Sequence, residues 1–452
     1  MGYNTNSVMM PEEKEEIKKA VTDAISADMS TDIAQIIAAA NHINELDNNV
    51  NENSAAIKAL LADKKQYGGN WEWAEVVEVV DSGNAPVVFP LGTQFTIDTP
   101  TVSKQVWDVV SHDDVIDQYG NKVHGMQLQQ HYTSDDAVPF SAATALYVAP
   151  DGLAAGIYYF TIPASYDVNY NDLKTDEDTE TVPIQFTTTK DLPPGGQLRL
   201  NWGNSTNLSQ GAVYTYANQR VQYTTVEPLT EKCSISRGTG GTLLGHASAN
   251  TYTGNFAPIS RNRYGSNNYK ESFVRQRLRS ADAANTYWQP QTPFDRMPSQ
   301  AITQHGFLYD LPEDFINAIC PIQVRTCTND YDEYDPNDAP KSSYLTTEKI
   351  YLPSFTEVCG SKINNIAEGK RFDITIGYVQ ADWIKRTKSG AAQLWWYRSP
   401  VEWSTHYARG CSNTGITEKN YIASSAYRLA PACTIAKSTT APAANDSAAV
   451  EA

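Results

Sequence analysis

The chain has 452 residues, 52 acidic and 35 basic side chains, and a formal net charge of −17. This charge argues against a nucleic-acid binder and against docking on an anionic membrane, because both functions need a basic surface. No apolar run of about 18 residues occurs, so we expect no membrane insertion, and residues 1–11 lack the basic and apolar regions of a secretory signal.

The charge is unevenly distributed along the chain and divides it into three parts. Residues 1–66 carry a net charge of −5, residues 67–230 carry −14, and residues 231–452 carry +2. All six cysteines lie in the third part. We therefore predict a helical attachment and oligomerisation region at 1–67, a connector domain at 70–230, a third domain at 231–436 and a low-complexity tail at 437–452.

The first region is predicted to form a coiled coil. Two positions of a heptad repeat are filled by Ile36, Ile43, Val50 and Ile57, and by Ala39, Leu46, Asn53 and Leu60. Asn53 would set the register at some cost in stability, and the short seam does not fix the number of helices. The alternative is an amphipathic helix packed on its own domain. We favour a homo-oligomer, because an isolated helix of this kind needs partners.

The second region is predicted to be an antiparallel β-sandwich. Short β-type runs are separated by Gly, Pro, Asn and Asp; they lie at 76–80, 87–89, 94–97, 105–110, 126–129, 145–148, 156–162, 182–187 and 197–200. Residues 112–114 and His124 are the one group here that resembles metal ligands. A polar loop at a strand end is the favoured interpretation, and we predict no metal site.

Part of this region resembles a module of known proteins. Residues 71–96, with Ala85-Pro86, Phe89-Pro90 and Gln94-Phe95, and then Trp107 to Asp113, are similar to a module in structural proteins of tailed phages of gut bacteria. The resemblance covers about 150 residues of the chain.

The third region contains four motifs in a characteristic order. They are a basic amphipathic helix at 268–280 with Phe273 and Leu278 facing inward, an alternating strand at 344–354, the sequence WWYRSP at 395–400, and a closing strand at 427–435. This order resembles a bacterial and phage domain family with a W-W-L-R-S-P motif. The chain departs from the family pattern at Tyr397 and at 427–431.

The resemblance implies a C-type-lectin-like fold related to the formylglycine-generating type. The fold class implied for the whole chain is thus α+β, with an N-terminal coiled coil, a β-sandwich and a C-type-lectin-like domain. In the WWYRSP strand, Arg398 is expected to pair with a carboxylate or a carbonyl group, and Pro400 is expected to end the strand.

Residues 401–425 show little periodicity and are predicted to form a loop surface that binds a ligand. Large and adaptable side chains gather there, as in a paratope. The candidate binding residues are Trp403, His406, Tyr407, Arg409, Asn413 and Tyr421. The same layout resembles phage tropism determinants, whose receptor-binding residues lie between the corresponding strands. The alternative is an ordinary packed loop.

Enzyme chemistry is not indicated, and we predict no catalytic residue and no cofactor. The chain has no G-x-S-x-G, H-E-x-x-H or phosphate-loop motif. The related formylglycine-type enzymes use a reactive cysteine pair, but no motif assigns that role to Cys411 or Cys433. The state of the cysteines, free or disulfide-bonded, stays open.

The sequence therefore predicts a phage virion protein that is assembled in the host cytoplasm. It would form a trimer, by analogy with the usual symmetry of such fibres, and would attach to capsid or tail proteins through its N-terminal region. Its tip would bind a host-surface or mucus ligand, either a glycan or a protein. The alternatives are a bacterial surface adhesin of the same domain family and an enzyme of the formylglycine-generating type.

Overall fold

The computed structural model describes residues 71–99, 104–166, 181–188, 191–200, 220–224, 232–331 and 343–439, together with Glu15, Glu16 and Lys19. These residues form a mixed α/β fold with many strands and few helices, and none of the described sheets closes into a barrel. The predicted α+β class is confirmed at this level. The heptad residues from Ile36 to Leu60 lie outside the described part of the chain, so the coiled coil stays a prediction.

Two of the predicted strands are helices instead. Helix α4 (Trp73–Asp81) contains the run at 76–80, and helix α5 (Ala85–Val88) contains part of the run at 87–89. Val76, Val79 and Val80 are buried on one face, a spacing that suits a helix and not a strand. The β-branched side chains suggested a strand, but packing of this face against helix α9 (Glu313–Ala318) outweighs that propensity.

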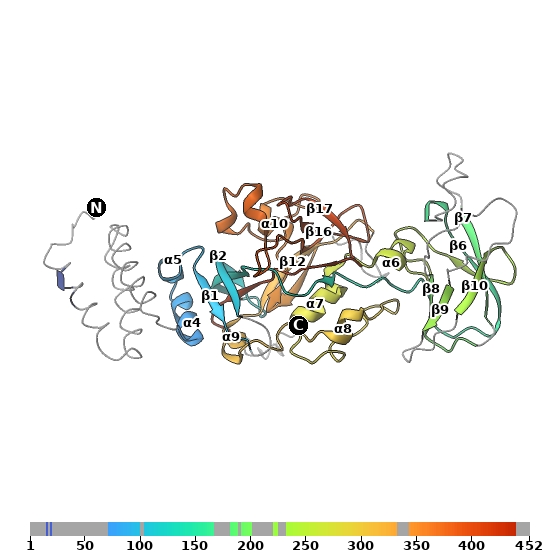
Figure 1. Cartoon of the computed structure of the whole chain (residues 1–452), viewed down its shortest axis with the longest axis horizontal. Coiled ribbons are helices and arrows are strands. Elements are labelled where there is room, and N and C mark those ends of the chain that lie inside the picture. The colour runs from blue at the N-terminus through green and yellow to red at the C-terminus, as the bar shows by residue number, and fades with distance from the viewer. Residues whose placement is uncertain are drawn as a thin grey trace, which may run out of the picture.

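A five-stranded sheet, called the central sheet below, includes strands β1 and β2, which Figure 1 labels beside helix α4. Its strands lie in the order β1 (Gln94–Ile97), β2 (Gln105–Ile116), β3 (Lys122–Gln130), β19 (Ala432–Ile435) and β14 (Ile350–Tyr351). Every neighbouring pair is antiparallel. Both faces are buried, since Trp107 and Leu128 belong to one hydrophobic cluster and Val110 and Tyr351 to another.

This sheet joins parts of the chain that the sequence analysis had separated. Strand β19 pairs with β3 through Cys433 opposite Leu128 and Ile435 opposite Met126. Strands β1 to β3 therefore share a sheet and a core with the C-terminal segment, and the predicted boundary at residue 230 does not coincide with a boundary between sheets. The physical reason is burial. Strand β19 is apolar and buried, so it needs a paired strand on each of its two edges.

A seven-stranded sheet lies at one end of the described molecule, where the ribbon is mostly green (Figure 1). Its order is β11 (Thr242–His246), β6 (Gly156–Pro163), β7 (Thr181–Thr188), β10 (Lys232–Arg237), β9 (Arg220–Thr224), β8 (Gly196–Leu200) and β5 (Tyr147–Ala149). Phe160, Phe186 and Phe256 form the centre of its separate core. The predicted strands at 156–162, 182–187 and 197–200 are confirmed.

The remaining elements are small sheets, short helices and 3-10 turns. The small sheets are β15 (Trp395–Pro400) with β16 (Tyr407–Cys411) and β17 (Lys419–Ile422), β12 (Ile322–Cys327) with β13 (Ser343–Glu348), and β4 (Val138–Pro139) with β18 (Ala426–Tyr427). The other helices are α6 (Ile259–Tyr264), α7 (Phe273–Arg279), α8 (Ser299–Thr303) and α10 (Phe355–Cys359), and the 3-10 turns are η1 (Ala164–Tyr166), η3 (Tyr269–Glu271), η4 (Asp373–Thr375) and η5 (Gln380–Trp383). None of the described helices is both long and apolar enough to span a bilayer.

Two of the four motifs of the third region form the predicted elements, whereas the predicted strands at 344–354 and 427–435 are each divided between two sheets. The segment at 268–280 contains η3 and α7, with Phe273 and Leu278 buried and the Ser272 hydroxyl accepting the backbone N–H of Arg275. The WWYRSP segment is the fully buried strand β15. The prediction of a continuous loop at 401–425 is wrong, because β16 and β17 lie inside it and pair antiparallel with one another.

The beginning of the predicted low-complexity tail is attached to the body. The ammonium group of Lys437 lies 2.7 Å from an Asp81 carboxylate oxygen, and the hydroxyl of Thr439 donates to Asp117. These contacts connect the C-terminal segment to α4 and to the turn after β2. The tail from 440 onward lies outside the described residues.

Candidate functional site

Three of the predicted binding residues form one aromatic group. The Trp403 and Tyr407 rings lie 5.7 Å apart, and those of Tyr407 and His406 lie 4.4 Å apart. Trp403 is 53% exposed, whereas His406 is buried and stacks on Tyr264. Burial and the nearby Arg261 charge lower the pKa of His406 to about 4, so it is a neutral packing residue at pH 7. Of these three residues, only Trp403 and Tyr407 offer surface to a ligand.

The other three predicted residues lie in different surroundings. The Arg409 guanidinium pairs with Glu402 at 2.7 Å and lies over the Phe355 ring. Asn413 is exposed in the turn between β16 and β17. Tyr421 is half-buried and packs on Trp396 and Tyr427; its pKa is raised by this burial. The six residues do not form one continuous aromatic surface.

The fully buried side chain of Asn267 holds the backbone of the loop that carries Trp403. Its amide nitrogen donates to the Ser404 carbonyl at 2.6 Å and to the Tyr407 carbonyl at 2.8 Å, and its amide oxygen accepts from Asn329 at 2.8 Å. Thr405 adds a hydroxyl contact of 2.6 Å to Ser260. A loop whose carbonyls are bonded in this way holds its exposed side chain in one place. No sequence signal pointed to Asn267.

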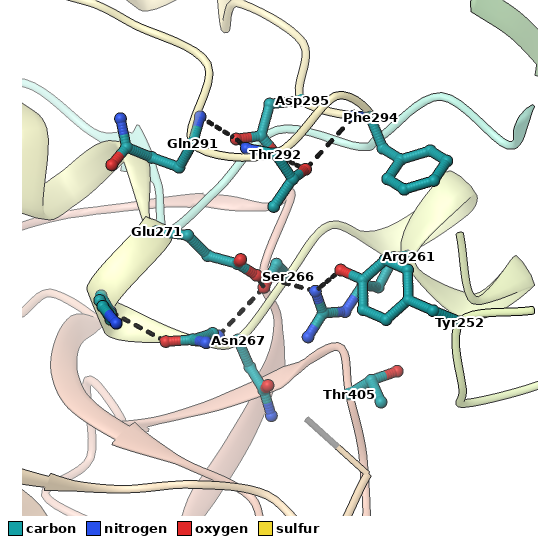
Figure 2. A network of polar contacts seen from close by, with 12 residues as sticks. Tyr252, Arg261, Ser266, Asn267, Glu271, Gln291, Thr292, Phe294, Asp295 and Thr405 are labelled. Carbon is teal, nitrogen blue, oxygen red and sulfur yellow. Dashed lines mark hydrogen bonds and ion pairs between the residues drawn. The ribbon is translucent and has the colours of Figure 1, made fainter. Parts of the chain in front are cut away.

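A buried ion pair lies beside this anchor (Figure 2). The Arg261 guanidinium is 1% exposed, donates to Glu271 at 2.8 Å, and contacts the Tyr252 hydroxyl. In Figure 2 the Ser266 hydroxyl donates to the same Glu271 carboxylate, and Asn267 and Thr405 lie nearby. Because α6 carries Arg261 and follows the seven-stranded sheet in the chain, this pair fixes the junction of the two cores.

Arg398 occupies the centre of the scaffold behind the aromatic group. It is fully buried and donates to both carboxylate oxygens of Glu357, at 2.6 and 2.8 Å. It also donates to the carbonyls of Leu352, Arg325 and Glu368. Burial alone would lower its pKa, but Glu357 outweighs that effect and the net pKa is raised. The prediction that Arg398 pairs with a carboxylate or a carbonyl is confirmed, since it does both.

A cavity that the sequence analysis missed lies between the central sheet and the loop at 374–386. Its volume is about 200 Å³. Its lining combines aromatic, aliphatic and charged side chains, including Asp108, His131, Tyr132, Tyr378, Trp383, Lys385 and Trp395. Three segments far apart in the chain contribute them, so no local spacing could have shown the site.

The groups considered for metal or cysteine chemistry are separate from one another. His124 pairs with Asp114 at 2.7 Å, and His112 bonds the Phe89 carbonyl instead. Within the described ranges no group of three or more metal-ligating side chains occurs. Cys411 and Cys433 are buried free thiols, and burial raises the pKa of Cys411 to about 12 and raises that of Cys433.

The comparison with known families gives one match. Residues 242–437 match a family described as a domain of unknown function (DUF6273). This stretch contains the aromatic group, Asn267 and Arg398, but not β1 to β3. No curated protein and no solved structure matches the chain.

Proposed function

We propose that the chain is a tailed-phage virion protein that displays a binding surface for a host-surface or mucus ligand, either a glycan or a protein. In this proposal residues 1–67 form a trimeric coiled coil that attaches to capsid or tail proteins. The seven-stranded sheet, to which residues 147–246 contribute, serves as the connector in place of a β-sandwich at 70–230, and the C-terminal domain has a C-type-lectin-like fold. The protein acts by binding and performs no catalysis.

The observation that carries the proposal is the exposed Trp403 on an internally anchored loop. Exposing a large aromatic side chain to water is unfavourable, and such residues dominate binding energy where a partner covers them. The buried amide of Asn267 fixes the neighbouring backbone at Ser404 and Tyr407. A surface that is ordered before it binds loses less conformational entropy on binding.

The same geometry supports binding over the cysteine-based enzyme. A nucleophilic cysteine needs a lowered pKa and an accessible position, whereas Cys411 has a raised pKa and a buried sulfur. A bacterial adhesin with the same domain stays the second candidate, since it would use the same aromatic surface. The location of the protein distinguishes these two functions.

The test of the binding surface uses a labelled full-length chain and host cells of the phage. Replacing Trp403 and Tyr407 together by Ala is expected to reduce cell binding about tenfold or more, the size of a hot-spot loss. The matched control is Tyr119→Ala, which removes another exposed aromatic ring, in the turn between β2 and β3. Equal binding by the double variant, the control and the unaltered chain would contradict the proposed surface.

A further inference from the structure

We propose that the cavity between strands β2 and β3 and the loop at 374–386 is a binding site for a carboxylate-bearing sugar. The site is separate from the surface around Trp403. Its lining is its own, and the site does not depend on the protein being part of a virion.

The cavity has a buried floor and an open rim. Trp395 is 2% exposed and forms part of the floor, whereas Asp382 and Arg386 are exposed at the margin. The volume of about 200 Å³ is below that of sites for drug-sized molecules, which span roughly 300 to 1,000 Å³. The space suits one sugar ring at the end of a longer glycan that leaves through the rim.

Aromatic rings give the cavity the surface that a sugar ring needs. Tyr378 and Trp383 lie 5.2 Å apart at an interplanar angle of 68°, so they form two walls at an angle to each other. Tyr132 and Trp395 complete the aromatic lining. The C–H face of a sugar packs on such rings, while its hydroxyl groups need polar partners nearby. A small inorganic anion would make no use of these walls.

Lys385 gives the cavity a positive charge and N–H donors beyond the one that bonds Gln130. Its ammonium group donates to the Gln130 carbonyl at 2.7 Å, and an ammonium carries three N–H donors. Burial lowers the pKa of Lys385 to about 8, so the group is still mostly charged at pH 7. Among the described residues no carboxylate lies within ion-pair distance of it.

Asp108, the acid whose charge acts on Lys385, already has other hydrogen-bond partners. Asp108 accepts hydrogen bonds from His131 at 2.7 Å and from Gln94 at 3.0 Å. Because Nδ1 of His131 is hydrogen-bonded to Asp108, the other ring nitrogen, Nε2, can bond a sugar hydroxyl. Asp108 and Asp382 balance the charges of Lys385 and Arg386 in the lining, but neither forms an ion pair with Lys385, and the carboxylate of an acidic sugar would give its ammonium group that direct partner. A neutral sugar would leave the ammonium without an ionic partner.

The test measures binding of free monosaccharides to the full chain by calorimetry at pH 7. The probes are glucuronate, galacturonate and N-acetylneuraminate, with glucose and galactose as neutral counterparts. At least one acid is expected to bind at least tenfold more tightly than the neutral sugars. Failure of all three acids to bind, or equal binding of acid and neutral sugar, would overturn the proposal.

Variants of one hairpin separate the charge from general effects on folding. Lys385→Met removes the charge and keeps most of the stem, and it should weaken acid binding at least tenfold, whereas Lys385→Arg should retain part of it. Lys388→Met is the control, because Lys388 lies on the same hairpin but lines a different cavity. If Lys385→Met binds the acid like the unaltered chain, the assignment of Lys385 is wrong.

A pH series on the unaltered chain tests the assignment without a variant. Affinity for the acid is expected to fall between pH 7.5 and pH 9, as Lys385 loses its proton. The other ionisable groups that face it are Asp108, His131, Tyr132, Tyr378, Asp382, Arg386 and Cys411. Burial raises the pKa of Tyr378 and of Cys411, which keeps both protonated in this range. Constant affinity across the range would contradict the role of Lys385.

Discussion

Arg398 shows how much of the scaffold depends on a single residue. Its guanidinium joins Glu357 to the carbonyls of Leu352 and Glu368, which come from three segments of the C-terminal region. The carboxylate of Glu368 is itself fully buried, and burial raises its pKa. A buried acid without its cationic partner must either take up a proton or move to a position where water reaches it. Either event destabilises the fold.

Replacing Arg398 by Met is therefore expected to lower the free energy of unfolding by about 3 to 5 kcal/mol. Urea unfolding at pH 7 measures this loss. The control is Lys104→Met, whose ion pair with Asp98 is 69% and 76% exposed, and which should cost less than about 1 kcal/mol. Similar losses for the two variants would show that Arg398 is not the centre of the scaffold.

His406 gives the protein an expected loss of stability in acid. Its pKa of about 4 lies below its ordinary value of 6.5, chiefly because the ring is buried. The unfolded chain therefore takes up this proton more readily than the folded one, and stability is lost as the pH falls from about 6.5 to about 4, by about 2 to 3 kcal/mol. Unfolding in urea at pH 7 and at pH 4.5 measures the loss.

The variant His406→Gln isolates this effect from the titration of the acids. It should lose less stability between the two pH values than the unaltered chain. The control variant His124→Gln changes a histidine whose side chain is 58% exposed and should behave like the unaltered chain. The same pH dependence in His406→Gln would mean that His406 is charged in the folded protein.

The loop at 401–406 is the element whose order matters most for the proposed function. It contains the exposed Trp403, and its shape depends on the buried Asn267. Removing that side chain leaves the Ser404 carbonyl without its amide donor, whereas the Tyr407 carbonyl keeps the backbone N–H of Val401. Each buried group left unpaired costs about 1 to 3 kcal/mol.

Asn267→Ala is expected to increase hydrogen exchange of the backbone amides at 401–407 and to weaken host-cell binding, although no exposed side chain is removed. Exchange measured by mass spectrometry tests the first effect, and the cell-binding assay tests the second. Asn413→Ala, in the exposed turn between β16 and β17, should change neither exchange at 401–407 nor overall stability. Unchanged exchange in Asn267→Ala would refute the anchoring role.

The elements found from the sequence are those whose pattern is local. Phe273 and Leu278 on α7 and the apolar strand β15 could be recognised from adjacent residues. Helix α4 was missed because its valines favour strands and its helical spacing covers only Val76 to Val80. The pairing of β3 with β19 and the cavity around Lys385 unite residues hundreds of positions apart, which no local pattern encodes.

At the scale of the whole molecule, the uneven charge is distributed over two parts of the chain that share one sheet. The net charge of residues 1–230 is −19 and that of residues 231–452 is +2. These two parts are not separate bodies, since β1 to β3 belong to the same sheet as β14 and β19. In the proposed function, mutual repulsion of the acidic parts would keep crowded copies soluble, and the near-neutral part would contact the ligand.

Deleting residues 1–66 is expected to convert the proposed trimer into a monomer, because this region holds the predicted heptad repeat. The β-sheets should remain folded, since their cores come from residues after 70. Light scattering after size-exclusion chromatography measures the mass, and circular dichroism measures the folded state. A chain without residues 1–66 that keeps the mass of the full-length oligomer would refute the coiled coil.

The most direct test of the proposed function is the location of the protein. An antibody against the purified chain is applied to gradient-purified virions of the phage to which the proposed function assigns it, and the labelled particles are imaged by electron microscopy. We predict a label in several copies per particle, on the capsid or the tail, at positions exposed to the outside. Complete absence from the particle, with the protein found instead on the bacterial surface or only in the cell extract, would contradict the proposed virion function.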